Sequence, residues 1–296
     1  MKCNPHCAAC LLKKQQQFLA GMHAPQEKKQ AYLHAVTEMI NRYSSEESSP
    51  CLLARIAVLQ KEYLDYIEDM SAEKRLFNDI LLQKEALFQN EIDSADDPLA
   101  AALRLSRAGN YIDLSAVENV TDEKLFALLR EAKDSVLDEK TLHAFRQDLL
   151  HAKKLTFCTD NCGEVVLDKL LIKTIQKLYP DLQITVMVRG ENVINDATME
   201  DAEQINLTGI APVIGNGTAI PGTDPDSLSG KAKEAFESAD LIISKGQGNF
   251  ESLSGCGYNI YYLFLCKCDH FVQMFGLKQF EGVFARERSL FPGNNA

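Results

Sequence analysis

Two short stretches of the chain place an acid directly beside an amide. Asp160-Asn161 follows the strand-like run 155–158, and Asn195-Asp196 precedes a helical run that starts near Thr198. Neighbouring carboxylate and amide oxygens at the end of a strand are suitable ligands for a hard divalent cation. The same residue types also form ordinary turns and Asx caps on a following helix. Each stretch is therefore either half of a metal site or a helix cap.

A lysine followed by two glycines ends another strand-like run. Lys245 comes directly after the apolar run 241–244 and precedes Gly246 and Gly248, which allow the backbone to approach a ligand closely. A lysine in this position is a suitable point charge for a phosphate group. No Gly-x-Gly-x-x-Gly follows the first strand, so the sequence does not support a dinucleotide-binding domain.

The first half of the chain supplies one further polar group. Residues 108–113 read Ala-Gly-Asn-Tyr-Ile-Asp, so that a helical run ends in glycine and Asn110 and Asp113 follow three apart. These two side chains are candidates for a ligand site. The alternative is a glycine helix terminus followed by ordinary turn residues.

Three cysteines at the start of the chain form a candidate second metal site. Cys3, Cys7 and Cys10 have C-x3-C-x2-C spacing with His6 between them, and three thiolates this close can hold zinc or an iron–sulfur cluster. The spacing also occurs in radical-SAM enzymes, where it lies at the mouth of a barrel, whereas helical sequence follows it here. Simple buried or surface thiols are the remaining interpretation.

The apolar pattern indicates which elements must position these groups. Spacing of three and four predominates up to residue 149, whereas β-rich runs and helical runs alternate after residue 150. We predict an α/β protein in which an all-helical domain over 1–150 precedes a three-layer α/β/α Rossmann-like domain over 151–296, with a mainly parallel sheet. The predicted strands are 155–158, 184–188, 213–214, 241–244 and 260–266. Parallel strands share one carboxyl edge, so we expect the polar turns to converge there.

Composition limits the classes of partner. The chain of 296 residues is 46% hydrophobic and 25% charged, as in ordinary globular proteins, and its net charge of -11 argues against a broad nucleic-acid interface. The longest apolar run, 258–266, is too short to span a bilayer. The first residues lack the apolar core of a signal peptide. We therefore expect a cytoplasmic protein with neither nucleic acid nor membrane as a partner, whose nine cysteines are thiols or metal ligands.

The order of these motifs resembles the DUF89 family, the ARMT1-like metal-dependent damage-control phosphatases. The similarity extends over almost the whole chain. The cysteines at the start of the chain resemble the branch of the family that has an N-terminal cysteine motif. It rests on Ala-Gly-Asn-Tyr-Ile-Asp at 108–113, Asp-Asn-Cys-Gly-Glu at 160–164, Arg-Gly at 189–190 with Asn-Asp-Ala-Thr at 195–198, and Lys-Gly-Gln-Gly-Asn-Phe-Glu at 245–251.

This resemblance implies an enzyme that hydrolyses phosphate monoesters of small metabolites, such as sugar phosphates, phosphopantetheine-like compounds or damaged cofactor phosphates. By the resemblance, Asp160, Asn161 and Asp196 hold a divalent metal (Mn, Co, Ni or Mg), and Lys245 binds the substrate phosphate. These four are the expected catalytic residues. The other positions that the resemblance places at the substrate are Asn110, Asp113, Glu164, Arg189, Asn195, Gly246, Gly248 and Asn249.

Three other functions fit parts of the sequence. A haloacid-dehalogenase-type phosphatase also begins with an acid after a strand, but it needs a second acid two residues later, where this chain has Cys162. An S-adenosylmethionine-dependent carboxyl methyltransferase would be favoured by a glycine-rich first strand–helix turn, which the sequence lacks. The third alternative is a non-enzymatic metal-binding or redox protein built on the cysteines.

Overall fold

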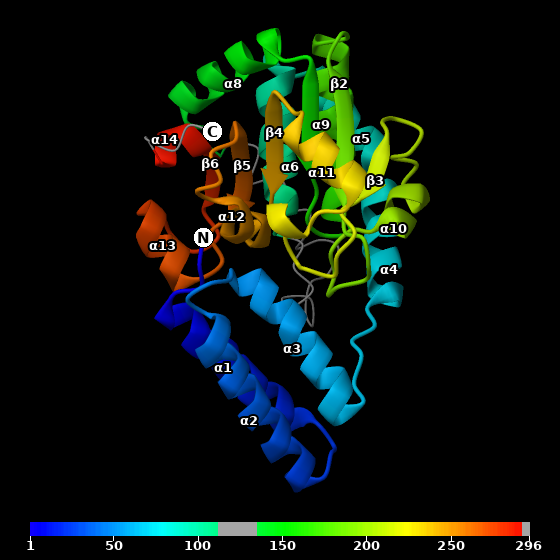
Figure 1. Cartoon of the computed structure of the whole chain (residues 1–296). Coiled ribbons are helices and arrows are strands. Elements are labelled where there is room, and N and C mark those ends of the chain that lie inside the picture. Colours follow the sequence, from blue (N-terminus) through cyan, green and yellow to red (C-terminus); the bar gives the residue numbers. More distant parts are fainter. Residues whose placement is uncertain (112–134, 292–296) are drawn as a thin grey trace.

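A six-stranded sheet with helices on both faces forms the body of the protein, shown by a computed structural model that describes residues 1–111 and 135–291 (Figure 1). The strands are β1 (Lys154–Cys158), β2 (Gln183–Val188), β3 (Val213–Gly215), β4 (Leu241–Lys245), β5 (Ile260–Leu265) and β6 (Gly282–Arg286). Their order is β3-β2-β1-β4-β5-β6, and only β6 runs antiparallel to its neighbour. The predicted fold class and the five predicted strands are confirmed.

Strand β6 was not predicted from the sequence. It is an edge strand in which Val283 and Phe284 are buried, and it pairs antiparallel with β5 so that Leu263 lies opposite Phe284. Two buried residues are too few to show the two-residue periodicity of a strand in the sequence. Its pairing with β5 depends on tertiary contacts, which the local sequence does not encode.

The two faces of the sheet are covered by different helices because successive strand residues point to opposite sides. Leu155 and Phe157 of β1 join the larger core cluster, whereas Cys158 belongs to the smaller one. Helices α4 (Ser71–Leu82), α5 (Glu85–Asp93), α6 (Pro98–Gly109), α8 (Glu139–His151), α9 (Glu164–Leu178) and α10 (Met199–Gln204) contribute to the larger cluster. Helices α11 (Gly230–Glu237), α12 (Gln247–Leu253), α13 (Asp269–Phe275) and α14 (Glu287–Leu290) lie with the smaller cluster.

Helix α9 is the most deeply enclosed of the helices that surround the site. It follows β1 directly and is buried on all sides over its first nine residues, between the sheet and helices α4, α5 and α6. Helix α6 lies against it closely because Gly109 has no side chain; a Cβ there would lie 3.0 Å from Leu167 Cδ1 and 3.2 Å from Glu164 Cγ. The tight packing brings side chains of α6 into contact with the start of α9.

The first three helices form their own apolar cluster, which projects from below the sheet in the view of Figure 1. They are α1 (Pro5–Gly21), α2 (Gln26–Tyr43) and α3 (Ser49–Leu64). Pro50, in the first turn of α3, reaches the turn after β4, where its Cγ would be 3.9 Å from a Cβ on Gly248. No helix in the described ranges is both long enough and apolar enough to cross a membrane.

Candidate metal and phosphate site

The carboxyl ends of the three central strands bring the predicted residues together. Strands β2, β1 and β4 are parallel neighbours, and Arg189, Asp160 and Lys245 lie at or directly beyond their carboxyl ends. The second acid–amide pair is brought there by an isolated bridge between Asn161 and Asp196, and by a 2.7 Å bond from the Ala197 N–H to the Asp160 carbonyl. The two stretches singled out in the sequence are therefore side by side.

The site concentrates more negative than positive charge in a buried space. Asp160, Asp196, Glu164 and Asp168 are all buried, and within the described residues Lys245 and Arg189 form ion pairs with them. Lys267 and Lys74 add electrostatic attraction to Asp160 and Asp196, respectively. Burial, followed by repulsion from Asp196 and Glu164, raises the pKa of Asp160 well above its usual range. Burial also raises the pKa of Asp196, although Arg189 opposes that shift. Four carboxylates and two ion-paired cations leave an arrangement that a divalent cation would neutralise.

Two amides link the carboxylates at the centre. The Nδ2 atom of Asn161 donates to Asp160 Oδ2 at 2.7 Å and to Glu164 Oε2 at 3.0 Å. Asn110, from the end of α6, donates to the same two oxygens at 2.9 and 3.0 Å, and its Oδ1 accepts from the Leu265 N–H at 3.1 Å. Asn110 is thus fully hydrogen-bonded and buried beneath the site.

Lys245 is fully buried, and acceptors surround its ammonium group. Nζ donates to Asp168 Oδ1 at 2.5 Å, to Glu164 Oε1 at 2.6 Å and to the Ser106 carbonyl at 2.9 Å. Burial alone would lower the pKa of Lys245, but the carboxylates of Asp168 and Glu164 outweigh it and raise the pKa. An ammonium has three donors, so direct contact with a phosphate would require one of these three bonds to break.

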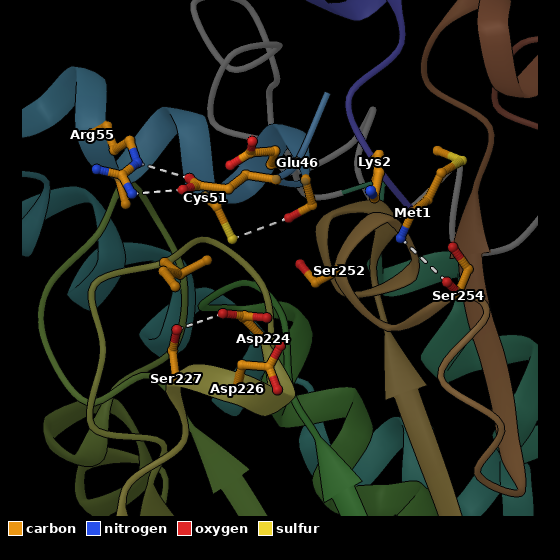
Figure 2. A pocket seen from close by; sticks show the side chains of 14 residues that line it. Met1, Lys2, Glu46, Cys51, Arg55, Asp224, Asp226, Ser227, Ser252 and Ser254 are labelled. Atoms are coloured by element: carbon orange, nitrogen blue, oxygen red, sulfur yellow. Dashed lines mark hydrogen bonds and ion pairs between the residues drawn. The ribbon is translucent and has the colours of Figure 1, made fainter. Parts of the chain in front are cut away.

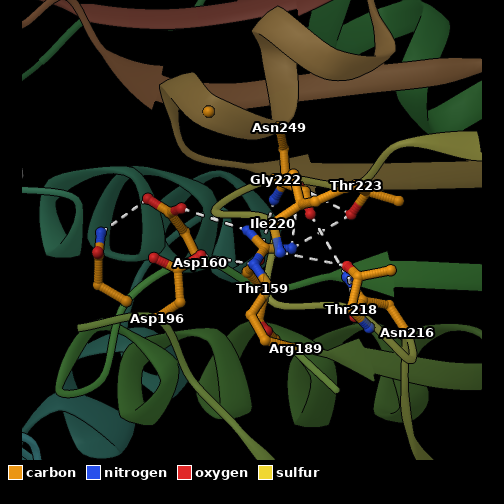
Figure 3. Close-up of polar contacts among 12 residues, drawn as sticks. Thr159, Asp160, Arg189, Asp196, Asn216, Thr218, Ile220, Gly222, Thr223 and Asn249 are labelled. Carbon is orange, nitrogen blue, oxygen red and sulfur yellow. Dashed lines mark hydrogen bonds and ion pairs between the residues drawn. The ribbon is translucent and has the colours of Figure 1, made fainter. Parts of the chain in front are cut away.

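Arg189 lies between Asp160, Asp196 and Asn249 and is paired with each of them (Figure 3). Its Nε donates to Asp196 Oδ2 at 2.5 Å, and Nη1 donates to Asn249 Oδ1 at 3.2 Å and to Thr223 Oγ1 at 3.3 Å. Nη2 is buried, forms an ion pair with Asp160 Oδ1 at 3.7 Å, and makes no hydrogen bond to any residue that the structure describes. The guanidinium therefore aims a desolvated N–H group at the space beside Asp160.

Asn249 holds Arg189 in this position. Its Nδ2 donates to the carbonyls of Lys245 at 2.6 Å and Thr159 at 2.9 Å, while its Oδ1 accepts from Arg189 and from Thr223 at 2.8 Å. All of its groups are used within the protein. In this arrangement Asn249 contributes to the site by orienting Arg189.

The two glycines after β4 are needed for close packing. Gly246 has a φ of +79°, and a Cβ on it would lie 2.0 Å from Asp160 Oδ2. A Cβ on Gly248 would lie 2.3 Å from the Pro221 carbonyl oxygen. Asn195 is buried, its side-chain Nδ2 makes no hydrogen bond within the described residues, and its backbone carbonyl accepts from the Cys162 N–H at 2.9 Å. Asp113, also expected at the site, lies outside the described residues.

Sequence reasoning missed three residues that support the site. Asp168 and Ser106 contact Lys245, and Thr223 contacts Arg189. Asp168 could have been found, because it lies four residues after Glu164 on the same face of a predicted helix. Ser106 contacts Lys245 through its carbonyl, which every residue has, so no sequence signal marks it.

The donor chemistry at the centre fits a hard divalent cation. Asp160, Asn161 and Asp196 offer two carboxylates and an amide, the oxygen ligands that Mg²⁺ and Mn²⁺ accept. The N-terminal cysteines differ: Cys3 is buried, Cys7 is half-buried and Cys10 is exposed. Within residues 1–111 and 135–291, no three His, Cys, Asp or Glu side chains are grouped so as to hold a metal ion.

A separate cavity of about 520 Å³ lies beside the start of α3 (Figure 2). Its walls come from the first two residues, the start of α3, the 220–227 loop and the end of α12, and they include Lys2, Arg55, Asp224 and Ser252. The residues predicted for the site do not line this cavity in the described part of the chain. Asp224, which lines the cavity, follows Thr223, whose hydroxyl donates to Asn249 Oδ1 at 2.8 Å in the strand-end cluster.

Comparison with known proteins gives a consistent result. Residues 3–283 match the family model described as "Damage-control phosphatase ARMT1-like domain". A damage-control phosphatase from Archaeoglobus fulgidus is 31% identical over 91% of this chain and 93% of its own length. A damage-control phosphatase from Pyrococcus horikoshii is 27% identical over 90% of this chain and 92% of its own. The crystal structure of a DUF89 family protein from Pyrococcus horikoshii superposes with a TM-score of 0.80 at 25% identity, covering 97% of this chain and 99% of that one.

Proposed function

The chain belongs to the damage-control phosphatase ARMT1-like family, and from that membership we propose that it is a metal-dependent hydrolase of phosphate monoesters on small metabolites. Asp160, Asn161 and Asp196 would hold the metal ion. The observation that carries the proposal is the buried Nη2 of Arg189, which makes no hydrogen bond within the described residues and lies 3.7 Å from Asp160 Oδ1. A buried N–H group without a hydrogen bond is costly, and a phosphate oxygen bound there would supply the missing acceptor.

In this proposal, different residues contact the phosphate, orient the contacting group and hold the metal ion. Arg189 Nη2 would donate to a phosphate oxygen and stabilise the charge that develops on it in the transition state. Asp196 and Asn249 fix the guanidinium, so the donor is already oriented before substrate binds. A divalent ion at Asp160, Asn161 and Asp196 would supply charge neutralisation and polarise the phosphoryl group.

Substrate class and metal follow from chemistry and family membership. The proposed substrates are sugar phosphates, phosphopantetheine-like compounds or damaged cofactor phosphates, because the polar groups described here address only the phosphate. Oxygen ligands of this kind accept Mn, Co, Ni or Mg. The expectation that Lys245 binds the phosphate remains a proposal that requires it to release an acceptor on substrate binding.

Hydrolysis of an aryl phosphate by metal-stripped protein tests the reaction class and the site together. We expect no turnover without metal, recovery when Mn²⁺, Co²⁺, Ni²⁺ or Mg²⁺ is added singly, and loss of that recovery in Asp160→Ala and Asp196→Ala. Asp181→Ala, an exposed acid on the loop before β2, is the matched control and should behave as the wild type. Full turnover in Asp160→Ala or Asp196→Ala would show that the metal ligands are wrongly assigned. Equal turnover with and without metal would show that the enzyme is not metal-dependent.

A further inference from the structure

The orientation of the Asn161 amide is set by its neighbours. Its two polar partners, Asp160 Oδ2 and Glu164 Oε2, are carboxylate oxygens, which when ionised can only accept hydrogen bonds. Asn161 must therefore present its NH2 group to them. Its Oδ1 faces away and receives no hydrogen bond from any described residue. Oδ1 is the atom that an amide offers to a metal ion.

Glu164 in turn is held from both of its oxygens. Oε2 accepts from the amides of Asn110 and Asn161, each at 3.0 Å, and Oε1 accepts from Lys245 at 2.6 Å. The side chain has no exposed surface. Glu164 is therefore enclosed by protein, and its three hydrogen bonds are all to protein groups.

Lys245 is fixed by a second layer of buried groups. Asp168 Oδ1 lies 2.5 Å from Nζ, and the Ser106 carbonyl lies 2.9 Å away. The Ser106 hydroxyl also donates to Asp168 Oδ1 at 2.6 Å. A continuous row of hydrogen bonds therefore runs from Asp168 through Lys245 and Glu164 to Asn161. In this row the Lys245 ammonium lies between two carboxylates, and the Glu164 carboxylate lies between that ammonium and the Asn161 NH2 group.

We propose that Glu164 is a positioning residue that turns Asn161 Oδ1 towards the metal, and that Asp168 and Lys245 hold Glu164 in place. This inference rests on the proposed metal site. Groups behind the ligands of a metal commonly set the orientation of those ligands, and losing one typically weakens metal binding by about 10–100-fold. In the substrate-free protein, Lys245 then contributes to metal affinity through Glu164 and Asn161.

Titration of metal-free protein with Mn²⁺, followed by electron paramagnetic resonance of the free ion, measures this role directly. In Glu164→Gln the new NH2 group must face either the Lys245 ammonium or the two amide NH2 groups, so the row is broken. We expect the Mn²⁺ Kd to rise about 10–100-fold in Glu164→Gln and about 10-fold in Asp168→Asn. Ser106→Ala, the gentlest change, removes one hydrogen bond and should raise the Kd about 3-fold.

Lys169→Met is the matched control for loss of a buried charge on the same helix. Lys169 is buried on α9 and bonds to Glu85 at 2.7 Å and to the Ile205 carbonyl at 2.7 Å, without touching the row. The thermal unfolding midpoint of Lys169→Met should fall, while the Mn²⁺ Kd of this variant stays at the wild-type value. Activity of Asp168→Asn should recover at saturating Mn²⁺, because its defect is in metal binding.

Asp196→Ala separates this inference from the proposed function. If that variant binds Mn²⁺ as the wild type does, the metal site and the proposed function are both wrong. If Asp196→Ala loses Mn²⁺ but Glu164→Gln, Asp168→Asn and Ser106→Ala keep the wild-type Kd, only the positioning role is overturned. An unchanged Kd in Asp168→Asn together with low activity at saturating Mn²⁺ would also overturn it, since Asp168 and Lys245 would then affect turnover without affecting metal affinity.

Discussion

Replacing Gly246 with alanine should damage the site more than it damages the fold. Gly246 has φ +79° and ψ 160°, a region that is almost exclusive to glycine and costs other residues about 1–3 kcal/mol. The added Cβ would lie 2.0 Å from Asp160 Oδ2, and ordinary contact begins at 3.4 Å. The carboxylate must therefore move by more than the roughly 0.5 Å that a functional constellation tolerates.

Two measurements separate the backbone cost from the effect on the site. Gly246→Ala should lose about 1–3 kcal/mol of unfolding free energy in urea without metal. Its kcat/KM on an aryl phosphate should fall about 100-fold, as expected for a displacement of about 1 Å at a reacting centre, and its Mn²⁺ Kd should rise.

Gly276→Ala is the matched control. Gly276 ends α13 with φ +64°, and a Cβ there would meet no atom within 4 Å. The substitution should cost about 1–2 kcal/mol of stability and leave the Mn²⁺ Kd and kcat/KM unchanged. The reasoning is refuted if Gly246→Ala keeps the wild-type Kd and kcat/KM, because Asp160 would then not depend on the close approach of this backbone.

Two further predictions concern Arg189 and pH. Arg189→Lys keeps a charge but loses the fork that bonds to Asp196 and Asn249, so steady-state kinetics should show a fall in kcat of about 100–1,000-fold, and a fall below tenfold would contradict its role at the phosphate. Burial raises the pKa of Asp168 from 3.8 to about 7 and also raises the pKa values of Asp160 and Asp196. Between about pH 4 and 7, these three carboxyl groups therefore bind more protons in the folded chain than in the unfolded chain. The thermal midpoint of metal-free protein should therefore fall as pH rises from about 4 to 7, less steeply in Asp168→Asn, and a midpoint that rises across this interval in both proteins would contradict the shifts.

The sequence was informative wherever a signal is local. The five parallel strands could be predicted because buried strands form short β-rich runs bounded by helices and turns. Asp160, Asn161 and Asp196 could be singled out because their residue types and their positions after strands can be read without knowing any partner. Parallel strands share one carboxyl edge, so their convergence could be expected from the fold class alone.

Only the tertiary structure decided what each polar group faces. Lys245 could be placed at a strand end, but its acceptors on α6 and α9 lie 139 and 77 residues away in the chain, and no local pattern encodes such a pairing. The missing hydrogen bond of Arg189 Nη2 within the described residues is likewise visible only once Asp196, Thr223 and Asn249 have accepted from the other guanidinium nitrogens. Residue type and local spacing thus determined where chemistry could occur, whereas packing across distant elements determined which atoms remain available for it.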